Sequence, residues 1–322
     1  MLSDTVVYRV PLTTRFRGLD WRDGVLVRGP AGWAEFSPFW DYDDVESVGW
    51  LRAAMEAADD GFPAPVRELV PVNVTIPVVS PERAAELVRA SGGCSTAKVK
   101  VAEPGEPLAA EVARLEAVRE ALGPGGRIRI DANGGWDVET ALARLPVLDR
   151  AAGGLEYVEQ PVASIADLAL VRRRQSVPVA ADESVRRAED PLAVARAEAA
   201  DVLVLKVQPL GGVRACLRIA EATGLPVVVS SALETSVGLA AGLALAAALP
   251  ELPFACGLAT AQLLGGDVVG ESLLPEGGSI AVRRPEPDRE LLVAARADGA
   301  VARRWAERLD RVRLLAGRRD LG

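Results

Sequence analysis

The sequence contains no histidine and only three lysines, although lysine and arginine together number 37. The absence of histidine excludes sites that need an imidazole, including Ser-His-Asp and Cys-His nucleophilic centres and His-ligated zinc. The lysines, Lys98, Lys100 and Lys206, all lie inside β-patterned runs. Because a guanidinium keeps its proton in proteins, lysines retained in an arginine-rich chain indicate a need for a group that can lose its proton near neutral pH.

Cysteine is also scarce, and long apolar runs are absent. Cys94, Cys216 and Cys256 lie far apart, without metal-type spacing and in odd number, which indicates a reduced, cytoplasmic chain. The N-terminus lacks a basic segment followed by an apolar one, so we expect no signal peptide. The longest apolar stretch, residues 237–249, is too short to span a bilayer.

Basic charge is not in excess, since the net charge is -8. Nucleic acids and anionic membranes are bound through basic patches, so we expect neither as a partner. A small-molecule carboxylate substrate is the partner that we predict, and the oligomeric state stays open.

After about residue 70, short β-branched runs alternate with alanine- and leucine-rich helical patterns, which is typical of βα units and a parallel sheet. About eight such strands recur every 20 to 30 residues or so, the number and pitch of a TIM-type barrel. Helices are predicted to begin at Ser80, Ser164 and Asp190. The predicted strands cover residues 72–77, 96–101, 127–133, 155–161, 177–184, 201–209, 225–231 and 253–258.

The two ends of the chain differ from this pattern. Residues 1–70 predict an α+β segment, with a strand, a hairpin around Gly18 to Trp33 and a helix from about Asp43 to Ala58. Residues 280–322 contain a long, arginine-rich amphipathic helix that we expect to pack back on the first segment. The predicted organisation is therefore a capping domain (1–70), a catalytic barrel (71–279) and a C-terminal segment (280–322).

Ionisable residues gather near the C-terminal ends of the predicted strands, where TIM barrels place their active sites. Lys98 and Lys100 are two residues apart on one strand and therefore share a face. We expect the two ammonium groups to repel and to depress each other's pKa towards the range of a general base. Lys206 lies on a later strand, across the barrel from them.

Three carboxylates, Asp131, Glu159 and Asp182, end three consecutive strands. Buried together they would carry a large electrostatic cost, which a divalent cation removes. Oxygen ligands without histidine or cysteine favour Mg²⁺, with Mn²⁺ as a possible substitute, over zinc. This arrangement suits removal of a proton alpha to a carboxylate, with the metal neutralising the developing charge and a lysine taking the proton.

The segments TAKVKV, IDANGGW, EYVEQP, AADES and VLKVQPLGG, in this order, resemble the muconate-lactonising subgroup of the enolase superfamily. The resemblance covers nearly the whole chain. It implies an α/β fold, a modified TIM (β/α) barrel with an N-terminal α+β capping domain. It also implies metal ligands at Asp131, Glu159 and Asp182, an acid/base role for Lys100, and Lys206 as its partner on the opposite face.

Within the subgroup, the short chain and abbreviated capping segment resemble an actinobacterial branch of lyases. These dehydrate a succinyl-bearing cyclohexadiene carboxylate in menaquinone biosynthesis. In this chain, Lys100 would remove the alpha proton and return it to the departing hydroxide, Lys206 would stabilise the enediolate, and Lys98 would tune the site. A mobile lid is expected at residues 15–21. The substrate-binding residues expected from this resemblance are Asn133, Ser230, Ser231, Gly257, Leu258 and Arg17.

Other reactions fit the same two lysines. N-acylamino acid racemisation is one, and dipeptide epimerisation is another, although the Asp-x-Asp pair usual at the eighth strand of the epimerases is missing from CGLATAQ. Muconate-type cycloisomerisation is a third. A non-catalytic barrel that retains the site as a relic is an alternative of a different class, and it predicts metal binding without turnover or no metal binding.

Overall fold

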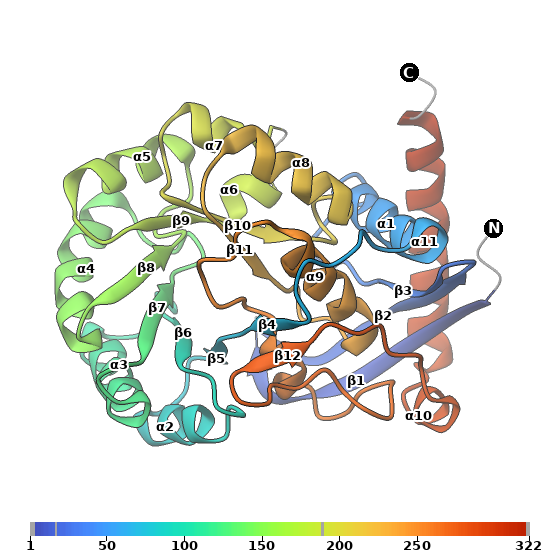
Figure 1. Cartoon of the computed structure of the whole chain (residues 1–322), viewed down its shortest axis with the longest axis horizontal. Coiled ribbons are helices and arrows are strands. Elements are labelled where there is room, and N and C mark those ends of the chain that lie inside the picture. The colour runs from blue at the N-terminus through green and yellow to red at the C-terminus, as the bar shows by residue number, and fades with distance from the viewer. Residues whose placement is uncertain (1–3, 17, 188–189, 320–322) are drawn as a thin grey trace.

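The computed structural model, which describes residues 4–16, 18–187 and 190–319, has a curled parallel sheet with helices outside it and a smaller α+β cap beside it (Figure 1). The central sheet has the strand order β11-β10-β9-β8-β7-β6-β5. Parallel order with one helix between most strands is the predicted βα arrangement, so the α/β barrel prediction is confirmed. The strands are β5 (Val74–Ile76), β6 (Thr96–Lys100), β7 (Arg127–Asp131), β8 (Leu155–Glu159), β9 (Val179–Ala181), β10 (Val202–Lys206) and β11 (Val227–Ser230).

The predicted eighth strand at 253–258 is wrong as a regular strand. Only Cys256 and Gly257 form bridges there, Cys256 with Val72 and Gly257 with Ser230, both parallel. Pro253 has no N–H to donate and Gly257 has no side chain to pack, which weakens a strand at this point. The two bridges nevertheless join the β5 side of the sheet to β11 and bring its edges together.

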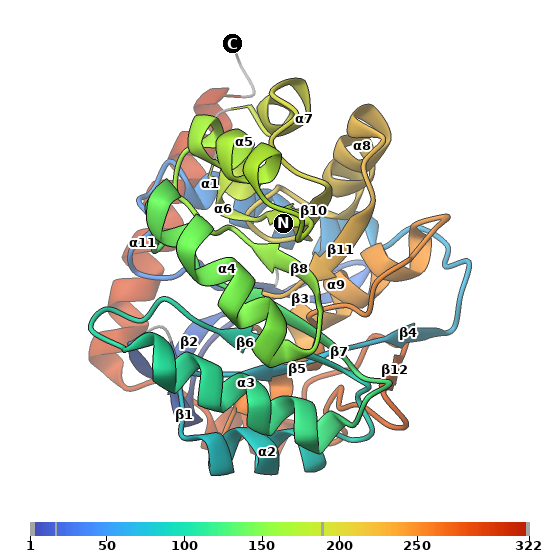
Figure 2. The same cartoon turned by 90° about the vertical axis from the view of Figure 1, so that its left-hand side faces the viewer.

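Helices cover the outside of the sheet, and Figure 2 shows α3, α4 and α5 lying across the strands. The predicted starts at Ser80 and Ser164 are confirmed, because each hydroxyl accepts a hydrogen bond from the backbone N–H three residues later. At the start predicted at Asp190, the Asp190 carboxylate accepts from the Leu192 N–H at 3.0 Å, but a turn intervenes and the four-residue helix α7 begins at Ala193, not at Pro191. The helices are α2 (Pro81–Arg89), α3 (Leu108–Leu122), α4 (Val138–Ala152), α5 (Ile165–Arg174), α6 (Glu183–Arg186), α7 (Ala193–Arg196), α8 (Val213–Thr223), α9 (Ser236–Ala248) and the 3-10 helix Ala259–Leu263.

The cap combines an antiparallel sheet with helices from both ends of the chain. Trp305 packs edge-on against Phe36, with ring centroids 6.0 Å apart, and lies 4.6 Å from Trp40. Arg308 donates to the carbonyls of residues 38, 39 and 42, so the C-terminal helix lies on the first segment. The elements are β1 (Asp4–Phe16), β2 (Leu19–Gly29), β3 (Gly32–Phe36), α1 (Ser47–Met55) with a π-helical turn (Glu56–Asp60), α10 (Arg289–Ala294) and α11 (Gly299–Arg319). A separate two-stranded sheet, β4 (Leu69–Pro71) with β12 (Ser279–Ala281), packs on the barrel core through Val70 and Ile280.

Three hydrophobic clusters of the described residues follow from this layout. The first fills the space between the barrel strands and their helices. The second lies in the cap and continues into Ala232 and Leu233, which follow β11. The third and smallest groups side chains of β8 to β11, namely Tyr157, Ala180, Val202, Val204 and Val228. In the described part of the chain, no helix combines the length and apolar character needed to cross a bilayer.

Candidate active site

The ionisable residues selected from the sequence come together at one rim of the sheet. Lys100, Asp131 and Glu159 are the last residues of β6, β7 and β8 and are paired in register across these strands. Asp182 follows β9 directly, and Lys206 is the last residue of β10. Parallel strands align their C-terminal ends, and this is why the five side chains meet.

The two lysines of β6 both contact Asp131. Lys98 Nζ lies 3.1 Å from Asp131 Oδ2 and 2.9 and 3.0 Å from the two oxygens of Glu159. Lys100 Nζ lies 2.5 Å from the same Asp131 oxygen and 2.7 Å from Asn133 Oδ1. The Lys98 side chain is 7% exposed and that of Lys100 is 14% exposed, so Lys100 is the one nearer the opening.

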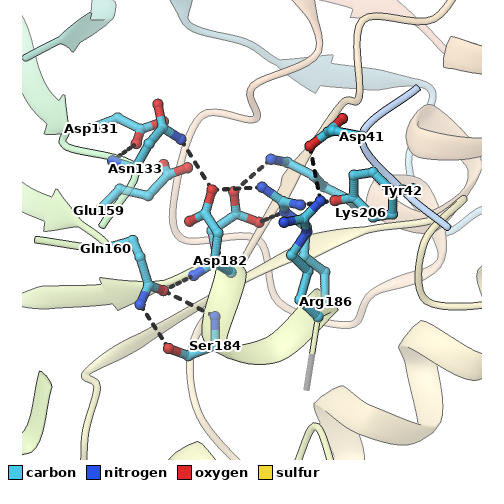
Figure 3. Close-up of polar contacts among 12 residues, drawn as sticks. Asp41, Tyr42, Asp131, Asn133, Glu159, Gln160, Asp182, Ser184, Arg186 and Lys206 are labelled. Atoms are coloured by element: carbon cyan, nitrogen blue, oxygen red, sulfur yellow. Dashed lines mark hydrogen bonds and ion pairs between the residues drawn. The ribbon is translucent and has the colours of Figure 1, made fainter. Parts of the chain in front are cut away.

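Asp182 lies at the centre of the second half of the site (Figure 3). Lys206 Nζ donates to its Oδ2 at 2.6 Å, and Arg186 Nε donates to its Oδ1 at 2.8 Å. Arg186 also donates to the hydroxyl of Tyr42, which comes from the cap. The side-chain oxygen of Gln160 accepts from the Asp182 N–H at 3.0 Å and so fixes the backbone that carries the carboxylate.

The charges shift one another's titration. Burial alone disfavours a charged Lys98, but the Glu159 and Asp131 carboxylates outweigh it and raise the pKa of Lys98 well above its usual value. The prediction that Lys98 has a depressed pKa is therefore wrong, because its ammonium meets two carboxylates. Burial lowers the pKa of Lys206, while Asp182 opposes this effect.

Burial and neighbouring charges also change the pKa values of the three carboxylates. Burial, and then the neighbouring Asp131, raise the pKa of Glu159 to about 7. Burial raises the pKa of Asp182 to about 6 against the opposing effect of Lys206. Asp131 is the exception, since Lys100 and Lys98 overcome its burial and lower its pKa.

These donors fit a divalent cation chemically. Among the described residues no three acidic, cysteine or histidine side chains already converge as a metal-ligand group, and lysine ammoniums lie against the carboxylates instead. The donors are oxygens only, and they sit on adjacent strand ends, which is the ligand type that Mg²⁺ and similar hard cations take. Asp131, Glu159 and Asp182 are the residues that could hold such an ion.

A pocket opens over these groups. Of the substrate-binding residues expected from the sequence, Asn133, Ser230, Ser231 and Gly257 line it. Leu258 is not among its lining residues and is 1% exposed, in contact with Gly242 of α9. Arg17 lies outside the described residues.

Sequence reasoning missed several lining residues that the cap and α6 supply. Arg186 follows Asp182 by four residues, so the helical spacing after a strand-end acid could have indicated it. Phe16 of β1, whose ring centroid is 5.7 Å from Lys100 Nζ, gave no such signal because its position depends on how the cap meets the barrel. The other missed lining residues are Phe39, Tyr42, Trp50, Thr75, Pro209, Ala232, Leu233 and Thr260.

Comparison with known proteins agrees with this geometry. Residues 81–288 match the family described as enolase C-terminal domain-like, and residues 7–58 match enolase N-terminal domain-like. The chain is 63% identical to o-succinylbenzoate synthase of Thermobifida fusca, over 94% of this chain and 93% of that protein. It is 50% identical to the o-succinylbenzoate synthase of Mycolicibacterium smegmatis, with coverage of 94% and 93%. The crystal structure of muconate lactonizing enzyme from Pseudomonas fluorescens, complexed with muconolactone, has the same fold, with a TM-score of 0.78, 21% identity and coverage of 91% and 98%.

Proposed function

The chain belongs to the o-succinylbenzoate synthase family of the enolase superfamily, and from that premise we propose how its own residues carry out the reaction. It is a hydro-lyase of menaquinone biosynthesis that converts 2-succinyl-6-hydroxy-2,4-cyclohexadiene-1-carboxylate into 2-succinylbenzoate and water. The family implies a divalent metal. We propose Mg²⁺, held by Asp131, Glu159 and Asp182.

Lys100 is the proposed base. It stands at the end of β6, contacts Asn133 and the ring of Phe16, and lines the pocket. In its neutral form it takes the proton from the ring carbon that bears the carboxylate. The electrons of that C–H bond enter the carboxylate as an enediolate. When the electrons return and the bond to the beta hydroxyl breaks, Lys100 gives the proton to the leaving hydroxide, so water departs and the lysine is neutral again.

Lys206 is the proposed counter-charge. It ends β10 on the other side of the pocket from β6, and Asp182 holds its ammonium at 2.6 Å. From there it stabilises the negative charge that grows on the enediolate oxygens. A bound Mg²⁺ supplies Lewis-acid stabilisation of the same charge. Lys98 pairs with Glu159 and Asp131 and holds these carboxylates in place.

Charge balance supports a dianionic substrate together with a divalent cation. In the described structure, four cations (Lys98, Lys100, Lys206 and Arg186) meet the three strand-end carboxylates and Glu183. The substrate carries two carboxylates and the metal carries two positive charges, so the pair enters without changing the net charge of these groups, which is zero with Lys100 protonated and -1 with Lys100 as the neutral base. We propose that Asn133, Ser230, Ser231 and Gly257 contact the substrate, with Leu258 beneath them and Arg17 from the lid.

We also propose that the functional units are a cap of residues 1–70, a barrel of residues 71–279 and a C-terminal segment of residues 280–322. The matches to the enolase-like N-terminal model at 7–58 and the C-terminal model at 81–288 support this division.

The observation that carries the proposal is the in-register row of Lys100, Asp131 and Glu159 facing Lys206 across one pocket. The test is turnover by the purified protein with Mg²⁺, offered the cyclohexadiene substrate in one series and N-succinyl amino acids in another. We expect 2-succinylbenzoate to form rapidly. Fast racemisation without dehydration would overturn the assignment, and metal binding without either reaction would identify a relic site.

A further inference from the structure

A strained segment of the pocket wall is held from the cap. Leu233 has a φ of +63°, a left-handed conformation that is costly for a residue with a side chain. It lines the pocket together with Ala232, yet both residues pack in the core of the cap. Such a conformation persists only where surrounding contacts hold the backbone in place. We call residues 231–235 the wall segment, and its contacts show what holds Leu233.

Arg22 of β2 donates hydrogen bonds to the backbone carbonyls of the wall segment. It is 1% exposed, and its Nε donates to the carbonyl of Leu233 at 2.9 Å. Its Nη2 donates to the carbonyl of Ala232 at 3.3 Å and to Ser37 Oγ at 2.8 Å. The guanidinium also lies 4.4 Å from the ring centroid of Phe39, another lining residue. One cap side chain therefore fixes two consecutive carbonyls of the barrel loop.

Two buried carboxylates accept hydrogen bonds from the backbone N–H groups of the wall segment. Glu234 accepts from the N–H of Ala232 at 2.7 Å, and Glu35 of β3 accepts from the N–H of Thr235 at 3.1 Å. Gly238 of α9 allows both to approach, since a Cβ there would come within 2.6 Å of Glu234 and 2.9 Å of Glu35. Carboxylates thus hold the wall segment at its N–H groups, and Arg22 holds it at its carbonyls. Arg22 and Glu35 lie about two hundred positions before the residues that they contact.

We propose that Arg22 is a positioning residue that holds the wall segment in its substrate-binding shape, so that the cap sets one wall of a barrel pocket. The inference rests on the proposed function, because it concerns the pocket for that substrate. The wall segment includes Ser231 and directly follows Ser230, two of the proposed substrate contacts, whereas the proposed base stands on β6. The effect of Arg22 therefore falls on substrate binding more than on proton transfer.

The first test compares Arg22→Lys and Arg22→Gln with the wild type. Lysine keeps a positive charge beside Glu35 and Glu234 but cannot present the planar fork that reaches both carbonyls. We expect KM for the cyclohexadiene substrate to rise about tenfold in Arg22→Lys, as for one lost charge-assisted hydrogen bond, with kcat within about threefold of wild type. Arg22→Gln, which also removes the charge, should raise KM further; if it does not fold, Arg22→Lys decides alone.

Arg119→Gln is the matched control. Arg119 donates to the carbonyls of Ala152, Gly123 and Gly126, at the end of the barrel where β7 begins, far from the wall segment. Its loss should lower the melting temperature without changing KM. If Arg22→Lys leaves KM unchanged, or if KM in both arginine variants merely follows the melting temperature, the positioning role is refuted.

A second substitution separates positioning from general packing. Glycine adopts positive φ without the cost that leucine has, so a wall segment with Leu233→Gly depends less on Arg22. In that background the effect of Arg22→Lys on KM should shrink to less than about threefold, a coupling that a double-mutant cycle measures. An equal tenfold effect in both backgrounds would contradict the proposal.

Hydrogen exchange tests the same idea without turnover. The amides of Ala232 and Thr235 should exchange faster in Arg22→Lys, while amides of β10 keep their wild-type rates. If the wild type does not dehydrate the substrate but these amides respond, the proposed function fails and the positioning role stands. If the wild type is active and these amides do not respond, the positioning role alone fails.

Discussion

Replacing Lys206 by methionine removes the proposed counter-charge while sparing the fold. Methionine keeps a similar length and apolar stem, and Asp182 retains Arg186 at 2.8 Å, so no buried carboxylate is left alone. An ammonium about 4 Å from the growing charge, at an effective dielectric constant of about 20, contributes about 4 kcal/mol. Its loss should lower kcat about a thousandfold. Because the ground-state carboxylate is also attracted to Lys206, a smaller rise in KM should accompany the fall in kcat.

The assay is the initial rate of 2-succinylbenzoate formation with saturating Mg²⁺, together with the melting temperature of each variant. Lys206→Arg is the control, since it keeps the charge beside Asp182 and should retain more activity than the methionine variant. A methionine variant within about tenfold of the wild-type kcat would refute the electrostatic role, because the loss of about 4 kcal/mol of charge stabilisation must lower kcat far more. Equal losses in both variants would show that shape, and not charge, matters at residue 206.

Three further predictions follow from buried charge. Arg129→Met removes the donor 2.6 Å from Glu156, which Arg127 still pairs, and leaves the Ala255 carbonyl without the Arg129 hydrogen bond, so it should lower the free energy of unfolding by about 1 to 3 kcal/mol in urea titrations. Burial raises the pKa of Glu234 from 4.5 to about 7 in the folded chain, so ionisation of Glu234 lowers the free energy of unfolding as pH rises through that window. Between pH 5 and pH 8 the free energy of unfolding of Glu234→Gln should therefore fall by up to about 3 kcal/mol less than that of the wild type. The same pH dependence of unfolding in both proteins would contradict this. Chelation should abolish dehydration while circular dichroism stays unchanged, because Lys98 and Lys206 already pair with the carboxylates; unfolding on chelation would be the contrary result.

Much of the fold and the central site was predictable because both depend on short-range periodicity. The period of two placed Lys98 and Lys100 on one face, and parallel strands brought Asp131 and Glu159 to the same rim. Strand ends that carry acids and lysines in an otherwise apolar pattern are visible in any single βα unit. These features need no knowledge of how distant segments meet.

The features that escaped prediction depend on distant contacts. Arg22 and Leu233 are separated by 211 positions, and no local sequence pattern around either residue predicts their contact. The raised pKa of Lys98 follows from how many carboxylates reach its ammonium, which spacing along β6 does not give. The irregular closure at Cys256 and Gly257 escaped for a related reason, since an apolar run of strand length forms a strand only where its partners allow a continuous ladder.

Single-turnover dehydration by Lys100→Arg determines directly whether Lys100 moves the proton. Arginine keeps the positive charge next to Asp131 but cannot lose its proton to become a base. We expect a rate at least about a thousandfold lower, since Lys100 both takes and returns the proton, with the affinity for 2-succinylbenzoate within about tenfold of wild type. A variant that still dehydrates the substrate within tenfold of the wild-type rate would show that another group moves the proton.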